Sequence, residues 1–189
     1  MIRVGILGEI GSGKTYVAKC FGYPVFNADS EVSKLYSNDI DTFKKLKKVL
    51  PKYFHSFPVN KNEILFSILD NKTNLRKIVK IVHSKIRKKL NHFLWQNRNK
   101  KLVVLDIPLL LENKINRKKD ILIFVQSKKS DILKKLKKRK NYNYRLLKKF
   151  KDIQLSSKYK KKRSNFIIKN NFKKKKIKKD IKNILSKIL

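Results

Sequence analysis

The residues with the clearest chemical meaning form a glycine loop close to the N-terminus. From Gly8 to Thr15 the chain fits the pattern G-x-x-x-x-G-K-[ST], with an apolar run before the loop and a segment free of helix breakers after it. This strand, loop and helix context is the one that the motif requires. Backbone N–H groups in such a loop turn toward a polyphosphate. The pattern therefore predicts ATP binding.

Two side chains at the end of the loop have separate expected roles. Lys14 would reach the β- and γ-phosphates, and the hydroxyl of Thr15 would bind a Mg²⁺ ion that bridges β- and γ-oxygens. ATP and Mg²⁺ are thus the expected cofactors. The residues expected to contact the nucleotide are Gly8, Glu9, Ile10, Gly11, Ser12, Gly13, Lys14, Thr15 and Tyr16.

Two aspartates follow predicted strands. Asp29 comes just after a short apolar segment, and ligands of open α/β sheets gather at the carboxyl ends of strands. Asp29 is therefore the candidate to orient or deprotonate an acceptor hydroxyl, and a helix cap at Asp29 or Ser30 is the alternative. Asp106 ends a strongly apolar strand and is a candidate metal ligand, with a structural hydrogen-bonding role as its alternative.

The elements that must position these groups alternate along the chain. Helical patterns cover residues 14–21 and most of 31–99. Apolar runs typical of buried parallel strands cover 2–7, 25–26, 101–107, 121–125 and 166–168. Strands that alternate with helices imply a parallel sheet covered on both faces. We expect an α/β fold, a P-loop NTPase-type parallel sheet of about five strands flanked by helices.

Length and composition limit the class of protein further. A chain of 189 residues, 41% of them hydrophobic, can bury a core and predicts one compact domain. No stretch approaches the ~18 consecutive apolar residues of a membrane-spanning helix, and the N-terminus lacks the pattern of a signal peptide. We expect a cytoplasmic protein without a membrane. Cys20 is the single cysteine and is expected to be a packed side chain.

The charge has two interpretations. The chain has 51 Lys and Arg residues against 13 Asp and Glu residues, a formal net charge of +38, which favours nonspecific binding to nucleic acid. The excess is mostly lysine spread along the chain beside many Asn and Ile residues, a pattern typical of AT-rich coding, so a solvated lysine surface is the alternative. Near the C-terminus the spacing of Ile181, Ile184, Leu185 and Ile188 predicts a docked helix with a basic outer face.

Three segments together resemble the dephospho-CoA kinase family. They are the loop opening Leu7–Thr15, the triplet Asn27–Asp29, and the element Asp106–Glu112, which reads Asp-Ile-Pro-Leu-Leu-Leu-Glu. The resemblance extends over nearly the whole chain, with later matches at Gln154 and Asn170. Its most diagnostic part is the Pro-Leu-Leu-x-Glu element. The resemblance implies ATP-dependent phosphorylation of the ribose 3′-hydroxyl of dephospho-CoA, the last step of coenzyme A synthesis.

The resemblance also implies further site residues. Arg139 closes a segment similar to the lid helix of the family, and it would join Lys14 and Asp29 as a catalytic residue by entering on a mobile lid. Lys61 occupies the place of a substrate-binding arginine, and His83 that of the histidine in a His-Pro pair. The residues expected to bind the substrate are Asp29, Lys61, His83, Pro108 and Leu109.

Four positions depart from the family pattern. Glu9 stands at a free position of the loop where a second glycine is common. Asn27 replaces the first aspartate of an Asp-Ala-Asp triplet, so one carboxylate is left for the role of base. Lys61 would bind phosphate as a point charge without the fork of an arginine. Ser84 replaces the proline after His83, and an ordinary helical role for this histidine stays open.

The resemblance implies a single P-loop kinase domain over residues 1–189, with its core in about 1–30 and 100–189. A helical substrate region would occupy about 31–99 and a lid about 139–159. We expect a monomer that acts on a small molecule. Two alternatives remain. One is a P-loop kinase for a nucleoside monophosphate or a shikimate-like hydroxyl, which would not need the segment Pro108–Glu112, and the other is a basic P-loop protein that binds nucleic acid.

Overall fold

The computed structural model describes residues 1–71, 73–138 and 142–189. Within these residues the chain divides into two compact units. The first unit comprises Met1–Asn27, Leu94–Tyr142 and Gln154–Leu189, and the second comprises Ala28–Phe93 and Asn143–Ile153. Each unit has its own hydrophobic core. Across the described ranges, no helix has the length and apolar character needed to cross a membrane.

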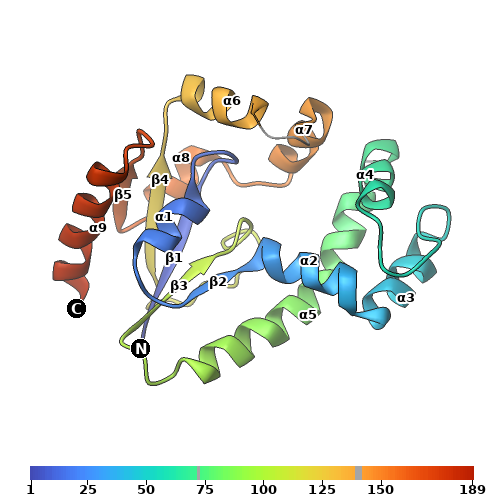
Figure 1. Ribbon diagram of the computed structural model, residues 1–189, viewed down its shortest axis with the longest axis horizontal. Helices are drawn as coiled ribbons and strands as arrows, with labels where there is room; N and C mark the ends of the chain where they lie inside the picture. The colour runs from blue at the N-terminus through green and yellow to red at the C-terminus, as the bar shows by residue number, and fades with distance from the viewer. Residues whose placement is uncertain (72, 139–141) are drawn as a thin grey trace. The chain divides into compact units, whose positions relative to one another are not determined.

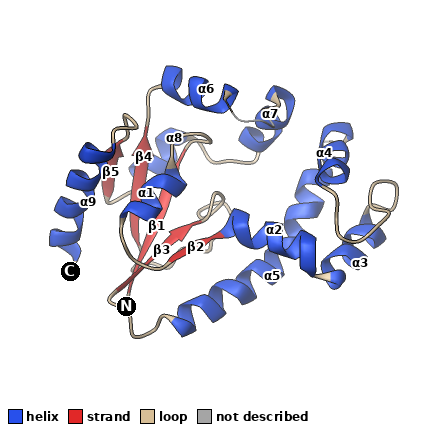
Figure 2. Ribbon diagram, in the orientation of Figure 1, coloured by secondary structure: helices blue, strands red, loops and turns tan. Residues whose placement is uncertain are grey.

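The first unit is built on a parallel sheet, drawn as red arrows in Figure 2. In the described residues the sheet has five strands in the order β2-β3-β1-β4-β5 (Figure 1). The strands are β1 (Ile2–Gly8), β2 (Val25–Asn27), β3 (Leu102–Asp106), β4 (Ile121–Gln126) and β5 (Phe166–Lys169). Strand β1 is central and pairs in parallel with both β3 and β4. The α/β sheet predicted from the apolar runs is confirmed.

Helices α1 (Lys14–Cys20) and α9 (Lys174–Ile188) pack on one face of this sheet. Helix α9 buries Ile181 and Ile184, and Leu185 and Ile188 are partly buried against the same core, so the docked terminal helix is confirmed. Cys20 packs beside this core. The buried members of this core are Val4, Ile6, Val17, Ala18, Phe21, Leu102, Val104, Ile123, Val125, Ile168, Ile177, Ile181 and Ile184. On β1, a Cβ at Gly5 would lie 2.5 Å from Cδ2 of Leu110, so a larger residue there would force this side chain to move.

The second unit is helical. Its core contains Leu46, Leu50, Phe54, Val59, Ile68, Leu75 and Ile78. Its helices are α2 (Ala28–Asn38), α3 (Ile40–Val49), α4 (Lys61–Asp70), α7 (Tyr144–Asp152) and most of α5 (Asn74–Gln96). Nζ of Lys149 on α7 donates hydrogen bonds to the carbonyl oxygens of Ile68 (2.6 Å) and Leu69 (2.8 Å). These carbonyls lie in the last turn of α4, where backbone acceptors lack helical partners, so Lys149 joins α7 to α4.

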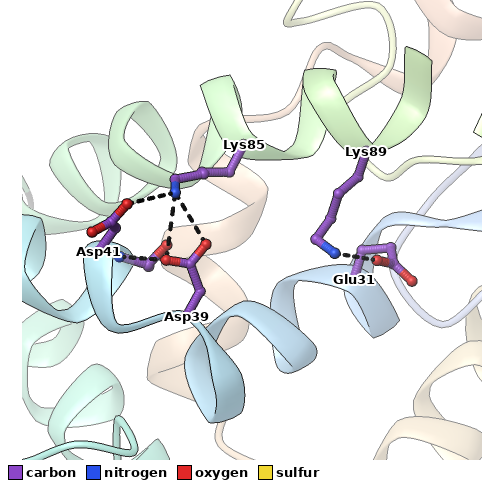
Figure 3. A network of polar contacts seen from close by, with 6 residues as sticks. Glu31, Asp39, Asp41, Lys85 and Lys89 are labelled. Carbon is purple, nitrogen blue, oxygen red and sulfur yellow. Dashed lines mark hydrogen bonds and ion pairs between the residues drawn. The ribbon is translucent and has the colours of Figure 1, made fainter. Parts of the chain in front are cut away.

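Ion pairs join α5 to α2 and α3. In Figure 3, Nζ of Lys85 lies between the carboxylates of Asp39 and Asp41, at 3.2 and 3.3 Å. One helical turn further along α5, Nζ of Lys89 pairs with Glu31 on α2 at 3.3 Å. The long helix α5 therefore carries its cations at a spacing of four residues, on the face that meets the acidic residues of the shorter helices.

The surroundings of these carboxylates change their pKa values. Burial raises the pKa of Asp39, but the hydrogen bond from the backbone N–H of Thr42 and the ion pair with Lys85 outweigh it, so the pKa lies below its ordinary value. For Glu31, the hydrogen bond from Lys34 is the main cause of a lowered pKa. Both carboxylates therefore favour the folded state in their ionised form.

This network predicts a loss of stability in acid. A carboxylate with a lowered folded pKa contributes stability above its unfolded pKa of about 4, and this contribution is lost as the pH falls through the folded pKa. Lys85→Met should therefore lower the free energy of unfolding at neutral pH by up to about 1 kcal/mol, and by less at about pH 3. Urea denaturation at both pH values measures this, with Lys88→Met on the exposed side of α5 as the control. An equal loss at both pH values would contradict the prediction.

Candidate active site

The phosphate loop connects the end of β1 at Gly8 to the start of α1 at Lys14. Gly11 and Gly13 have φ values of 85° and 89°, in the left-handed region that favours glycine. A Cβ at Gly13 would also lie 2.4 Å from Nδ2 of Asn170. Gly13, which the motif requires, is therefore needed here both for backbone conformation and for close packing, and Gly11, at a position that the motif leaves unspecified, is needed for backbone conformation.

The carbonyl oxygen of Ser12 fixes the loop to the sheet. It accepts hydrogen bonds from Nδ2 of Asn170 at 2.8 Å and from Oγ of Ser127 at 3.0 Å. Asn170 is buried directly after β5, and its Oδ1 accepts the backbone N–H of Phe172 at 2.7 Å. Ser127 directly follows β4. Side chains at the ends of two neighbouring strands thus hold the loop that follows the central strand.

Lys14 lies with its ammonium group on the loop itself. Its Nζ donates hydrogen bonds to the carbonyl oxygens of Gly8 at 3.1 Å and Glu9 at 2.8 Å. Thr15 and Tyr16 are exposed in the first turn of α1, and Ile10 is half-buried in the loop. The predicted nucleotide-binding residues thus form one short loop and the first turn of α1. They supply a cation and a hydroxyl group, the groups that a polyphosphate and its metal ion require.

Asp106 lies at the carboxyl end of β3, beside the central strand. It is buried, and its Oδ2 accepts a hydrogen bond of 2.5 Å from Nδ2 of Asn27, which is opposite Asp106 in the pairing of β2 with β3. An aspartate at position 27 would set two negative charges against each other, whereas the amide donates to the carboxylate. The structural hydrogen-bonding role considered for Asp106 is therefore present, and it leaves a metal-binding role open.

Asp29 is exposed in the first turn of α2. Helix α2 begins at Ala28, immediately after β2 ends at Asn27. The interpretation of Asp29 or Ser30 as a helix cap is wrong, because the strand passes into the helix without an intervening turn and both residues are already helical. Asp29 remains two residues beyond the carboxyl end of its strand, the feature that suggested a role in the reaction.

The segment after β3 is attached to α8 (Ser157–Lys162). Pro108 and Leu109 are half-buried in this segment. Oε1 of Glu112 accepts hydrogen bonds from Nζ of Lys160 at 2.8 Å and from the backbone N–H of Leu155 at 2.9 Å. The last residue of the Pro-Leu-Leu-x-Glu element thus has a structural task, which is to hold the chain that leads into α8.

The other predicted site residues have different surroundings. Lys61 is exposed at the first residue of α4, and His83 is half-buried in α5. Burial lowers the pKa of His83, and the nearby Arg87 lowers it further. Arg87 is one helical turn away on the same helix, as expected for an ordinary helical histidine. Arg139 lies outside the described residues. The roles of Lys61, His83 and Arg139 stay predictions.

Three residues that hold the site together were missed by sequence reasoning. Ser127 and Ser157 each lie close to another serine and to lysines, and Lys160 stands in the run Lys160–Lys162, so nothing in their spacing distinguishes them. Lys160 is nevertheless only 2% exposed. The unusual signal in the sequence was Glu112, a carboxylate in an apolar segment, which predicts a buried cation as its partner.

Comparison with known proteins decides the family. A family model described as dephospho-CoA kinase matches residues 2–176. The chain belongs to the dephospho-CoA kinase family. The curated dephospho-CoA kinase from the Wolbachia of Brugia malayi is 31% identical over 190 aligned residues, covering 98% of this chain and 97% of that protein. The dephospho-CoA kinase of Wolbachia pipientis wMel is also 31% identical, over the same shares of the two chains.

Solved structures share the fold. The protein TT1252 from Thermus thermophilus has a TM-score of 0.80 at 22% identity, covering 100% of this chain and 98% of that one. The dephospho-CoA kinase from Campylobacter jejuni has a TM-score of 0.62 at 20% identity, covering 98% and 96%. As a member of the dephospho-CoA kinase family, the chain is a transferase that uses ATP, and the reaction of the family is the last step of coenzyme A synthesis.

The close packing at Gly13 can be tested with Gly13→Ala and a control variant at Gly22. Gly13→Ala should weaken ATP binding at least about tenfold, because its Cβ would collide with Asn170 and distort the loop. Gly22→Ala imposes similar backbone strain, since φ there is 73°, but no described atom lies within 4 Å of its Cβ. Isothermal titration with ATP and Mg²⁺ compares the two. Equal losses of affinity in both variants would contradict an effect specific to the position of Gly13 in the phosphate loop.

Proposed function

We propose that the chain transfers the γ-phosphoryl group of ATP to the ribose 3′-hydroxyl of dephospho-CoA, with Lys14 and Thr15 at the nucleotide and Asp29 at the acceptor. The observation that carries this proposal is the phosphate loop, fixed through the Ser12 carbonyl and holding the ammonium group of Lys14. Phosphoryl transfer needs little covalent chemistry from the protein, because positioning and charge neutralisation supply most of the catalysis.

The ammonium group of Lys14 can donate hydrogen bonds either to carbonyl oxygens of the loop or to phosphate oxygens of ATP. Its ammonium group donates to neutral carbonyl oxygens of the loop. Charged phosphate oxygens accept stronger hydrogen bonds than neutral carbonyls do. We expect Lys14 to exchange the loop carbonyls for the β- and γ-phosphate oxygens when ATP binds, and then to neutralise the charge that develops during transfer.

The residues near the loop fit a Mg²⁺ ion. This ion takes few protein ligands and completes its shell with water and phosphate oxygens. Thr15 and Asp106 are the proposed ligands, directly or through water. When bound, the ion would neutralise the β- and γ-phosphates.

The acceptor end of the proposal depends on the family resemblance. Asp29 would accept the proton of the ribose hydroxyl late in the transfer. The substrate would contact Lys61, His83, Pro108 and Leu109 as well as Asp29. Arg139 would enter on the lid predicted over residues 139–159, of which the described part contains α7. The end of this range is attached to the first unit through Leu155 and Ser157, so the moving part would precede Leu155. A lid that closes over the reactants would exclude water from the phosphoryl group.

The remaining expectations concern the oligomeric state of the protein, its location in the cell and its association with nucleic acid. We propose a cytoplasmic monomer that acts on small molecules. The outer face of α9 carries exposed lysines at Lys174, Lys175, Lys176, Lys178 and Lys179. Together with the formal charge of +38, this face supports weak nonspecific association with nucleic acid that salt would abolish.

An acceptor panel tests the proposed function. ATP and Mg²⁺ are incubated with dephospho-CoA, AMP, CMP or shikimate, and we expect phosphorylation of dephospho-CoA alone. Lys14→Ala should reduce kcat/KM by about a hundredfold or more, since it removes the cation at the developing charge. Lys19→Ala, on the exposed side of the same helix, is the control and should keep the activity.

The results separate two parts of the proposal. Turnover of another acceptor would contradict the acceptor and leave the nucleotide site standing. Turnover of dephospho-CoA at the wild-type rate by Lys14→Ala would contradict the role of the loop lysine.

A further inference from the structure

Glu9 is a charged residue at a position that the phosphate-loop motif leaves unspecified. Both its backbone carbonyl group and its side chain accept hydrogen bonds. Its backbone carbonyl oxygen accepts hydrogen bonds from Nζ of Lys14 at 2.8 Å and from the backbone N–H of Ser12 at 3.1 Å. Its side chain Oε1 accepts a hydrogen bond from Oγ of Ser157 at 2.9 Å. One residue therefore accepts a hydrogen bond from Lys14 and ties the loop to α8 through Ser157, 148 residues away in the sequence.

Helix α8 is itself fixed by a buried ion pair. Lys160, 2% exposed, reaches Oε1 of Glu112, and the same oxygen accepts the backbone N–H of Leu155 just before the helix. The side chain of Glu112 is 10% exposed. Oε2 of Glu112 is buried without a hydrogen-bond partner among the described residues, so Glu112 holds the segment through Oε1. A buried pair of this kind fixes geometry, because separating it would leave an uncompensated charge inside the protein.

Ser156 is the N-cap of α8. Its Oγ accepts the backbone N–H of Tyr159 at 3.2 Å and so caps α8 at its first turn. The adjacent Ser157 is thereby placed in the first turn with its hydroxyl on Glu9. The short helix is thus held at its start by Ser156 and Leu155, and in its later half by Lys160.

We propose that α8 is a positioning element for the phosphate loop, and that Ser157 and Glu9 are the positioning residues through which it acts on ATP binding. A loop rich in glycine loses much conformational freedom when it orders around a phosphate chain, and a tether made in advance reduces that loss. The same hydrogen bond keeps the carboxylate of Glu9 on α8. Released from Ser157, this negative charge would repel the phosphates of ATP.

The negative charge of Glu9 and its hydrogen bond from Ser157 should affect the KM for ATP separately. Ser157→Ala removes the donor and leaves the charge, Glu9→Ala removes both, and Glu9→Gln removes the charge but keeps an oxygen that can accept from Ser157. Ser157→Ala should therefore raise the KM for ATP more than Glu9→Gln does. Because the tether acts on the loop before chemistry, kcat and the KM for dephospho-CoA should change little.

A double-mutant cycle tests the inference, which rests on ATP binding at the phosphate loop. Steady-state kinetics are measured for wild type, Ser157→Ala, Glu9→Ala and the double variant, with thermal unfolding as the check on folding. We expect Ser157→Ala to raise the KM for ATP about three- to tenfold, and the same change to have almost no effect when position 9 is already alanine.

The control is Ser164→Ala, which removes a hydroxyl hydrogen bond of 2.8 Å to the carbonyl oxygen of Lys160 at the other end of α8. It should leave the KM for ATP unchanged. Additive effects of the two substitutions, or an equal rise of KM in Ser164→Ala, would overturn the inference. A wild-type enzyme that does not saturate with ATP would instead contradict the nucleotide site itself, so the two failures are distinguishable.

Discussion

The phosphate loop has little side-chain bulk of its own, and its conformation depends on hydrogen bonds from residues far away in the sequence, two of which meet one backbone oxygen. Gly11 and Gly13 allow the tight course of the chain, but glycines do not hold it there. The hold comes from Asn170 and Ser127, whose side chains meet the carbonyl oxygen of Ser12. Both donors are side chains that directly follow β4 and β5, so the sheet itself holds the loop.

The order of the strands explains why this hold is possible. Strand β1 has β3 on one side and β4 on the other, so the loop that leaves β1 begins at the middle of the carboxyl edge. Residues that follow β4 and β5 therefore approach the loop from one direction, and Asp106 at the end of β3 lies on the other side. A parallel sheet places all of these chain ends on one edge, which is the general reason that its ligands bind there.

Much of this arrangement was predictable from the sequence, because the strongest signals were local. The apolar runs gave the strands, and the glycine pattern placed Lys14 and Thr15 at the start of a helix. The contacts that position the loop were not predictable in the same way. The contacts of Ser127, Ser157 and Lys160 form between segments that are far apart in the sequence, so they follow only from the complete fold. In the sequence, the buried Lys160 cannot be told from the exposed lysines beside it. The helix-cap interpretation of Asp29 failed for a related reason, since sequence pattern alone did not reveal that β2 continues directly into α2.

The most direct test of the account is the ATP affinity of Asn170→Ala, measured by isothermal titration in the presence of Mg²⁺. The matched control is Asn165→Ala, which removes a side-chain hydrogen bond of 2.8 Å to the backbone N–H of Leu122 at the opposite end of β5. The account predicts that Asn170→Ala weakens ATP binding about tenfold, while Asn165→Ala binds ATP like the wild type. Equal ATP affinity in the two variants would contradict the claim that the Ser12 carbonyl must be held for the nucleotide site to form.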